Sequence, residues 1–395
     1  MRSARAKWLF IGLLIVVTAG GLYQYFRPLP GIAPLGQTPT PPKTQGIALP
    51  WPSSGQAALG ANGYGVLEAH GGLTPVSTAS IAKVFTAIAV LQKKPLAAGS
   101  QGPTITLDQT DVDYFNYYYS RGGTVANVKV GEQITEYQLL QAMLLPSANN
   151  VADTLARWAF GSIQAYVTYA NQMVKNMGLA HTTVNNTNGF DDTTTSTADD
   201  LVKLGLEALK VPVIADVVNQ KSASIPVEGQ INNVNWLLGD NGVVGIKTGN
   251  TDKAGGCYLF AARHQILGRQ VILVGAVLGS SNLTDAITAG RNLASAADSG
   301  FQKINVIARG QVLGSYHAPW GANSQLKAGQ DLSLTVWKGK EIVITSDLEP
   351  AAAPAPAGAA IGSVHVTSGS QSISSPLYLS QDLAGPSWRW RLLRS

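Results

Sequence analysis

Length, composition and charge narrow the class of protein that this chain can form. The chain has 395 residues, 45% of them hydrophobic and 13% charged, with a formal net charge of +5. This size allows a sizeable core and about two domains. Lys and Arg form no dense run beyond the N-terminus, so nothing favours nucleic-acid binding. The single cysteine, Cys257, excludes an intramolecular disulfide, and the five histidines lack ligand spacing, so we expect no metal site and no cofactor.

The N-terminus carries a signal for membrane targeting. Arg2, Arg5 and Lys7 precede an apolar stretch from Trp8 to Phe26, which is long enough to span a bilayer. A cleaved signal peptide is the alternative, because Val17-Thr18-Ala19 offers small residues to a signal peptidase. We favour the anchor for residues 1–26, and either interpretation exports the remainder of the chain.

Residues 27–52 are rich in Pro, Gly, Thr and Gln and show no apolar periodicity, which predicts a linker. A hairpin is expected over Gln56–Ala69, because two apolar runs flank Ala61-Asn62-Gly63-Tyr64-Gly65.

A buried helix is predicted to begin at or just before Ser80. Apolar residues recur at helical spacing from Ile81 to Leu91, and Lys83 lies one turn after Ser80 on the same face. Lys83 can take the proton of the Ser80 hydroxyl only if desolvation or a nearby cation lowers the lysine pKa. Ser80 as a simple N-cap is the alternative, and Ser324-Gln325-Leu326-Lys327 repeats the same spacing.

The tyrosine-rich segment Asp111–Gly131 is interpreted as a polar segment that either lines a groove or forms a surface loop. Thr135-Glu136-Tyr137-Gln138 is a capping-box pattern that opens a helix, and Pro146 should end this helix. Because helical periodicity resumes at Val151, Ser147-Ala148-Asn149 is expected in a tight break between two helices.

Further helices and strands complete the region 53–299. Helices are expected over 163–178, 201–209 and 282–297, the second capped by residues 196–200, and strands over 243–246, 258–261 and 271–274. This order predicts an α+β domain in which helices pack on an antiparallel sheet.

Residues 300–395 predict a small all-β domain. Strands are expected over 305–308, 332–337, 342–345 and 361–366, and the Ala/Pro segment Pro350–Pro356 should be an extended loop. The ending Trp388–Arg394 is expected to be a final strand, with a basic-aromatic patch on anionic lipid as the alternative.

Three short motifs follow one another in order: Ser80-x-x-Lys83, Ser147-Ala148-Asn149 and Lys247-Thr248-Gly249. Each alone is weak, but their order and their expected positions on a helix start, an interhelical loop and a strand are hard to obtain by chance. The chain therefore resembles the serine-type D-alanyl-D-alanine carboxypeptidases, the low-molecular-mass penicillin-binding proteins, over about residues 56–293. The resemblance implies a β-lactamase/transpeptidase-like fold for the first domain.

The resemblance also implies catalytic roles. Ser80 would attack the carbonyl of the penultimate D-Ala of a peptidoglycan stem peptide and form an acyl-enzyme, with Lys83 as the base. Ser147 would relay a proton toward the leaving amine. Asn149 would bind the substrate amide and help to hold Lys83.

Binding roles follow from the third motif. By the same resemblance, Lys247 and Thr248 would bind the terminal carboxylate, and Gly249 would let the substrate backbone approach the strand. The backbone N–H groups of Ser80 and Asn250 would form the oxyanion hole.

Alternatives remain at this point: a β-lactamase, a non-turnover penicillin-binding sensor or scaffold, and a DD-endopeptidase. The loop Asn185–Asp192 contains no Glu, whereas class A β-lactamases use a Glu to activate the deacylating water. The expected partners are stem peptides ending in D-Ala-D-Ala, β-lactams as covalent inhibitors, and a membrane through the N-terminal helix. We expect a single-pass cell-membrane protein with its catalytic domain outside the cytoplasm, or a secreted one if the N-terminal segment is cleaved.

Overall fold

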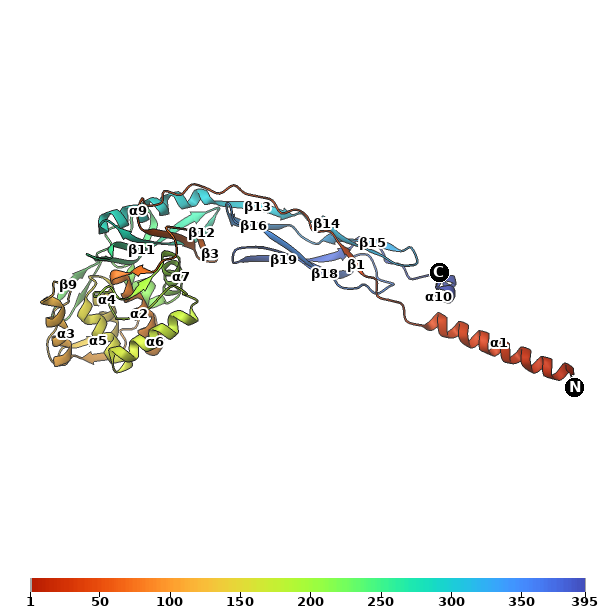
Figure 1. Cartoon of the computed structure of the whole chain (residues 1–395), viewed down its shortest axis with the longest axis horizontal. Helices are drawn as coiled ribbons and strands as arrows, with labels where there is room; N and C mark the ends of the chain where they lie inside the picture. Colours follow the sequence, from red (N-terminus) through yellow and green to blue (C-terminus); the bar gives the residue numbers. More distant parts are fainter. Residues whose placement is uncertain (1, 395) are drawn as a thin grey trace. The chain divides into compact units, whose positions relative to one another are not determined.

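The chain divides into two units, each with its own core (Figure 1). A computed structural model describes residues 2–394. Residues 46–301 form the α+β unit, and residues 1–45 together with 302–395 form the β-rich unit. Met1 and Ser395, the ends of the first and last predicted segments, lie outside the described residues.

The α+β unit is built on an antiparallel five-stranded sheet with the strand order β10-β11-β12-β2-β3. The predicted hairpin and the three strands predicted after residue 242 all lie in this sheet, so these predictions are confirmed. Strand β10 is an edge strand, which leaves one of its sides unpaired. The bounds are β2 (Gln56–Ala61), β3 (Gly65–His70), β10 (Val243–Thr251), β11 (Gly255–Ile266) and β12 (Arg269–Ser280).

Helices surround the sheet, and α2 is buried along ten consecutive residues, Ala82–Leu91, as expected of a core helix. The helices are η1 (Ala79–Ile81), α2 (Ala82–Lys93), α3 (Gln109–Tyr119), α4 (Glu136–Leu144), α5 (Asn149–Phe160), α6 (Ile163–Asn176), α7 (Ala198–Ala208), α8 (Pro212–Val218), η2 (Asp240–Gly242), α9 (Leu283–Ala297) and η3 (Asp298–Gly300). Short strand pairs connect them: β4 (Val76–Ser77) with β7 (Thr195–Ser196), β5 (Thr104–Thr106) with β6 (Gln133–Thr135), and β8 (Ser222–Ile225) with β9 (Gly229–Asn232).

Helices cover both faces of the sheet. A Cβ atom added to Gly205 of α7 would lie 3.2 Å from the Leu259 side chain, and one added to Gly290 of α9 would lie 2.7 Å from the Tyr258 ring. Leu259 and Tyr258 are neighbours on β11, and successive strand residues point to opposite faces. Helix α7 therefore packs on one face and α9 on the other, which makes the sheet the middle layer.

The predicted capping box of α4 is confirmed. The Thr135 hydroxyl accepts from the backbone N–H of Gln138, and the Gln138 side chain accepts from the backbone N–H of Thr135. The helix ends at Leu144, just before Pro146, and α5 begins at Asn149. Ser147 thus lies in the predicted break between two helices.

The first part of the tyrosine-rich segment Asp111–Gly131 is the helix α3, so the surface-loop alternative is wrong for that part. The Asp108 carboxylate accepts from the backbone N–H of Thr110, and Asp111 accepts from the backbone N–H of Asp108. This capping box made by two aspartates starts the helix. Tyr118 is then directed into the core, where it is 6% exposed.

The β-rich unit contains a six-stranded sheet with the order β1-β14-β15-β19-β18-β17 and the separate pair β13-β16. The all-β prediction is confirmed, although β14, β15 and β19 were not predicted. Part of the predicted linker is the short strand β1, which pairs with β14. The bounds are β1 (Pro34–Gly36), β13 (Phe301–Ile307), β14 (Val312–His317), β15 (Asn323–Ala328), β16 (Leu332–Trp337), β17 (Val343–Asp347), β18 (Ala360–Ser368) and β19 (Gln371–Leu379).

The end of the chain is helical, so the predicted final strand is wrong. Ser387 caps the short helix α10 (Trp388–Leu393) by accepting from the backbone N–H of Trp390. The Arg391 guanidinium donates to the Tyr25 carbonyl, and Arg394 donates to two further carbonyls nearby. These bonds hold α10 against the end of α1.

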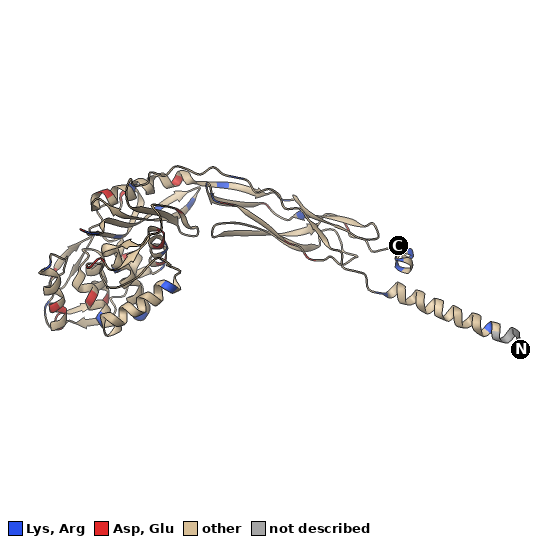
Figure 2. Ribbon diagram, in the orientation of Figure 1, with Lys and Arg blue, Asp and Glu red and all other residues tan. Residues whose placement is uncertain are grey.

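Helix α1 (Arg2–Phe26) confirms the predicted N-terminal helix. Its span Ala6–Phe26 has 21 residues, and from Trp8 onward it carries no charged side chain (Figure 2). By length and composition this helix is able to cross a membrane, a criterion that a signal sequence also meets.

Candidate active site

Ser80 lies in the turn η1, directly before the buried helix α2, as predicted. Its neighbour Ala79 has a φ of 44°, a left-handed conformation that is rare outside glycine. The loop 185–192 packs closely against this turn: a Cβ atom added to Gly189 would lie 1.8 Å from the Ala79 carbonyl oxygen. Such backbone strain is typical of functional sites.

The Lys83 amine connects three parts of the site. It lies 2.9 Å from the Ser80 hydroxyl oxygen, 2.7 Å from Oδ1 of Asn149 and 2.9 Å from the carbonyl oxygen of Asn188. Lys83 itself is 0% exposed. The structure therefore brings the first motif together with Asn149 of the second motif.

The environment of Lys83 favours its neutral form. Burial is the largest cause that lowers the pKa of Lys83 well below its usual value, and the positive charge of Lys247 lowers it further. The negative charge of Asp153 opposes both effects. Desolvation and a nearby cation are the two conditions under which a lysine can act as a base toward serine.

The third motif lies on β10, and Gly249 brings this strand close to the Ser80 turn. A Cβ atom added to Gly249 would lie 3.0 Å from the Ser80 backbone nitrogen and 3.1 Å from the Thr78 carbonyl oxygen. Lys247 and Thr248 are 2% and 4% exposed, and the Lys247 amine donates to the Thr248 carbonyl at 2.9 Å. Burial lowers the pKa of Lys247 to about 7.

Ser147 of the second motif has a φ of 74° and is 8% exposed. Among the described residues its buried hydroxyl has no hydrogen-bond partner, so it contacts neither Ser80 nor Lys83 through such a bond. A buried hydroxyl without a partner is unfavourable unless a ligand or water satisfies it. Among the described residues, Ser147 is therefore neither joined to the hydrogen-bond network of Lys83 nor part of the lining of the cleft described below.

A cleft of about 360 Å³ opens beside these groups. Ser80, Asn149 and Asn250 are the predicted site residues that line it. Four of its other lining residues, Arg121, Gly122, Gly123 and Thr124, belong to the tyrosine-rich segment Asp111–Gly131, so the groove-lining alternative for that segment is confirmed. The remaining lining residues are Phe190, Asp192, Thr251 and Asp252.

Asp192 joins two walls of the cleft. One of its carboxylate oxygens, Oδ1, accepts from the hydroxyls of Ser77 and Thr251, both at 2.6 Å. The guanidinium of Arg121 lies 3.9 Å from the centre of the Tyr117 ring. Asp192 ends the loop Asn185–Asp192 that the sequence analysis singled out, and Arg121 lies in the segment Asp111–Gly131 for which it offered a groove-lining role.

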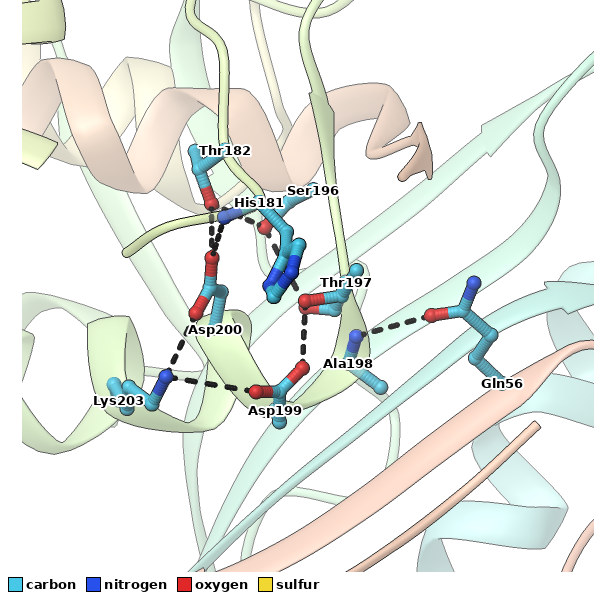
Figure 3. A network of polar contacts seen from close by, with 9 residues as sticks. All are labelled: Gln56, His181, Thr182, Ser196, Thr197, Ala198, Asp199, Asp200 and Lys203. Atoms are coloured by element: carbon cyan, nitrogen blue, oxygen red, sulfur yellow. Dashed lines mark hydrogen bonds and ion pairs between the residues drawn. The ribbon is translucent and has the colours of Figure 1, made fainter. Parts of the chain in front are cut away.

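A second polar cluster lies beside α7 (Figure 3). Ligand atoms of His181, Asp199 and Asp200 lie within 4.8 Å of one another, an arrangement that can hold a metal ion. Lys203 forms ion pairs with both carboxylates, at 3.5 Å and 2.8 Å, and Asp200 also accepts from the backbone N–H of His181. Both carboxylates thus share one protein cation and accept hydrogen bonds from neutral groups, and the cluster fixes the start of α7.

A partly exposed serine in contact with a desolvated lysine, beside an edge strand, is an arrangement typical of serine hydrolases. The chain belongs to the peptidase S11 family: the family model described as D-alanyl-D-alanine carboxypeptidase matches residues 58–282.

The chain is also similar in sequence to individual D-alanyl-D-alanine carboxypeptidases. The chain is 27% identical over 268 residues to D-alanyl-D-alanine carboxypeptidase DacA of Escherichia coli K12, a match that covers 66% of this chain and 65% of the relative. It is 29% identical over 224 residues to the D-alanyl-D-alanine carboxypeptidase of Streptomyces sp. K15, covering 52% of this chain and 74% of the relative. The match therefore spans slightly less than two thirds of the length of the Escherichia coli relative.

Solved structures share the fold. The Streptomyces K15 DD-transpeptidase is 25% identical with a TM-score of 0.56, and the match covers 63% of this chain and 98% of that one. Penicillin binding protein 5 of Haemophilus influenzae is 20% identical with a TM-score of 0.61, over 88% of this chain and 100% of that one. The α+β fold followed by an all-β region is thus an arrangement already known among penicillin-binding proteins.

Proposed function

We propose that the protein is a serine-type D-alanyl-D-alanine carboxypeptidase that acts on peptidoglycan stem peptides. The activity would lie in the predicted domain 53–299, and the β-rich region 300–395 would be an accessory domain. The observation that carries the proposal is the 2.9 Å contact between the buried Lys83 amine and the Ser80 hydroxyl.

In the proposed reaction the neutral Lys83 amine takes the proton of the Ser80 hydroxyl while Oγ bonds to the carbonyl carbon of the penultimate D-Ala. The carbon–nitrogen bond then breaks, the amine of the terminal D-Ala takes up a proton and leaves, and an ester remains on Ser80. Water hydrolyses the ester and restores the serine. The low pKa of Lys83, which results first from burial, supports its role as the base.

The position of β10 supports the binding roles. An edge strand can pair with an extended peptide, and Gly249 leaves room for one beside Ser80. The terminal carboxylate of the substrate would bind Lys247 and Thr248, while the backbone N–H groups of Ser80 and Asn250 would receive the oxyanion. Asn250 lines the cleft, as this role requires.

Ser147 would relay the proton to the leaving amine. Its unpartnered buried hydroxyl supports this role, because a bound substrate would supply the missing hydrogen bond. Asn149 would bind the substrate amide through its Nδ2 group while its Oδ1 atom holds Lys83. No step of this reaction uses a cofactor.

The protein would be anchored by α1 as a single-pass membrane protein with its catalytic domain outside the cytoplasm, where peptidoglycan lies. Basic residues before the apolar span support this orientation. β-Lactams would acylate Ser80 because they mimic the D-Ala-D-Ala end.

The test uses the full chain in detergent micelles and a peptide that ends in D-Ala-D-Ala. We expect the wild type to release free D-Ala and to be labelled covalently by a fluorescent penicillin, and Ser80→Ala to lose both activities. Ser324→Ala, the serine of the second Ser-x-x-Lys sequence, is the matched control and should retain both. Labelling of Ser80→Ala would contradict the assignment of the nucleophile.

Endopeptidase action is a second candidate, because other relatives carry that name. The chain is 28% identical over 204 residues to the D-alanyl-D-alanine endopeptidase of Escherichia coli K12. Cleavage of cross-linked dimers without release of D-Ala from the linear peptide would favour this reaction.

A further inference from the structure

Asp153 of α5 is a buried carboxylate for which the mechanism above has no role. It is 8% exposed. The two other buried aspartates of the α+β unit, Asp111 and Asp200, form ion pairs with Arg157 and Lys203. Among the described residues Asp153 has no such partner within ion-pair distance. A buried carboxylate without a paired cation is energetically unfavourable, so its presence needs an explanation.

Neutral donors satisfy this carboxylate. The Tyr118 hydroxyl donates to Oδ2 at 2.8 Å, and the Thr187 hydroxyl donates to Oδ1. The side-chain amide of Asn188 donates to the Tyr118 hydroxyl at 2.7 Å and reaches Asp153 Oδ1 at 3.4 Å. Asp153 therefore fixes two consecutive residues of the loop that faces the Ser80 turn.

Those two residues in turn hold α2. The carbonyl of Asn188 accepts from the Lys83 amine at 2.9 Å, and the carbonyl of Thr187 accepts from the Thr86 hydroxyl at 2.6 Å. Lys83 and Thr86 are one turn apart on α2. The loop segment thus lies between the carboxylate on one side and the amine on the other.

Asp153 also acts on Lys83 through charge. Its negative charge is the effect that raises the pKa of Lys83 against burial and Lys247. Burial is the largest cause that raises the pKa of Asp153 itself to about 6, so the carboxylate is ionised above that pH. Tyr118 of α3 and Asp191 of the loop act on Asp153, and Lys247 of β10 acts on Lys83. The charge of Asp153 in turn raises the pKa of Tyr114 of α3 and of Tyr166 of α6.

We propose that Asp153 is a positioning residue for Lys83: it holds the Thr187–Asn188 segment so that the Asn188 carbonyl receives the Lys83 amine. The inference rests on the proposed function only in taking Lys83 as the base.

The sign of the effect follows from the charge. Removing the negative charge lowers the pKa of Lys83, so the amine loses its proton at a lower pH. The rise of the acylation rate with pH, which follows deprotonation of the base, then moves to lower pH by about one unit. Loss of the carboxylate also frees the Asn188 carbonyl, and we expect the maximal acylation rate to fall about tenfold.

The experiment compares Asp153→Asn with the wild type as full chains in detergent micelles. The pKa of Lys83 is read from ¹³Cε-lysine NMR spectra over a pH series, with Lys83→Met identifying the signal. The second-order rate of acylation by a fluorescent penicillin is measured over the same pH range. The NMR reading needs no substrate, so it tests the inference even if the proposed activity fails.

Glu136→Gln is the matched control. Glu136 is 1% exposed, and burial raises the pKa of its carboxyl to about 7. Within the described part of the chain it forms no hydrogen bond or ion pair with Lys83, Asp153 or Asn188. This substitution should leave the pKa of Lys83 and the pH profile unchanged. A purely structural role of Asp153 would lower the melting temperature without moving either reading.

Tyr118→Phe provides a second variant in case Asp153→Asn does not fold. It removes the donor to Oδ2 and favours the protonated carboxyl, so we expect a smaller shift in the same direction. An unchanged pKa of Lys83 together with a superimposable pH profile, in whichever of the two variants folds, would overturn the proposal.

Discussion

The spacing Ser-x-x-Lys occurs in both units of the molecule, and only one copy brings its two side chains together. Ser80 and Lys83 lie at a helix start, where their side chains meet at 2.9 Å. Ser324 and Lys327 lie on strand β15, where residues three apart point to opposite faces. The Ser324 hydroxyl instead donates to the Gln381 carbonyl at 2.9 Å. The same Ser-x-x-Lys spacing therefore brings serine and lysine into contact on a helix but not on a strand.

The two units also differ in what they bury. In the described part of the β-rich unit the buried polar side chains are serines, namely Ser324, Ser368 and Ser375. The α+β unit buries Lys83, Asp153 and Lys247 around its cleft. Burying charge is unfavourable for stability, so its concentration in one unit marks where the fold serves chemistry.

Replacing the lysine of each motif should give the largest difference between the units. For Lys83→Met we expect kcat/KM for D-Ala release to fall about 10³-fold, because the general base is lost. Lys327→Met should leave kcat/KM unchanged. Steady-state kinetics on both variants test this, and a loss of similar size in the two would refute the distinction.

Gly249 and Gly314 have equally little room for a Cβ atom, one in each unit. Replacing each by alanine should therefore show an effect on the acylation rate at Gly249 and an effect on stability alone at Gly314. A Cβ atom at Gly249 would lie 3.0 Å from the Ser80 backbone nitrogen, and one at Gly314 of β14 would lie 3.0 Å from the Leu35 carbonyl oxygen. We expect Gly249→Ala to lower the acylation rate roughly tenfold to a hundredfold by displacing Ser80. Gly314→Ala should lower only the stability of the β-rich unit, by about 1–3 kcal/mol.

Penicillin acylation rates and calorimetry measure these two outcomes separately. Normal acylation of Gly249→Ala would mean that β10 can move away from Ser80 without consequence.

The smallest expected effect is a pH dependence of stability. Burial lowers the folded-state pKa of Lys247 to about 7 and that of Lys83 well below its usual value. Above pH 7 the unfolded chain therefore binds more protons than the folded one, so the stability of the α+β unit should rise with pH until the unfolded lysines titrate. Each proton contributes at most about 1.4 kcal/mol per pH unit, or roughly 2–4 °C in melting temperature.

Calorimetry between pH 7 and 9 measures this slope, and Lys247→Met should reduce it. Lys327→Met is the control that should leave the slope intact. If the melting temperature of the β-rich unit rose equally steeply with pH, buried lysines would not be the cause of the pH dependence.

Much of the fold was predictable because its signals are local. The capping box at Thr135 and the apolar run after Ser80 each depend on residues within a few positions of one another. Helix α3 was missed because its aspartate capping box stands before a polar, aromatic sequence without clear periodicity. Helix α10 was missed because alternating Trp and Arg resemble a strand, whereas its contacts come from residues more than 360 positions away.

The candidate site was predictable in its motifs but not in its surroundings. Ser80 and Asn149 belong to motifs recognised by their order along the chain, Asn250 was named through the family resemblance, and all three line the cleft. Arg121 was covered only by the general prediction for Asp111–Gly131, and Asp153 belongs to no motif, because their positions near the site depend on where other elements place them.

By itself the sequence determined which residues share a helix face, because helical geometry sets Ser80 beside Lys83. Tertiary structure alone decided that Asn149 and Asn188, which are 66 and 105 positions from Lys83, would share its amine. It also decided the basicity of that amine, since burial and the charges of Lys247 and Asp153 act through space. Local spacing is fixed by backbone geometry, whereas desolvation exists only once the whole unit has packed around the side chain.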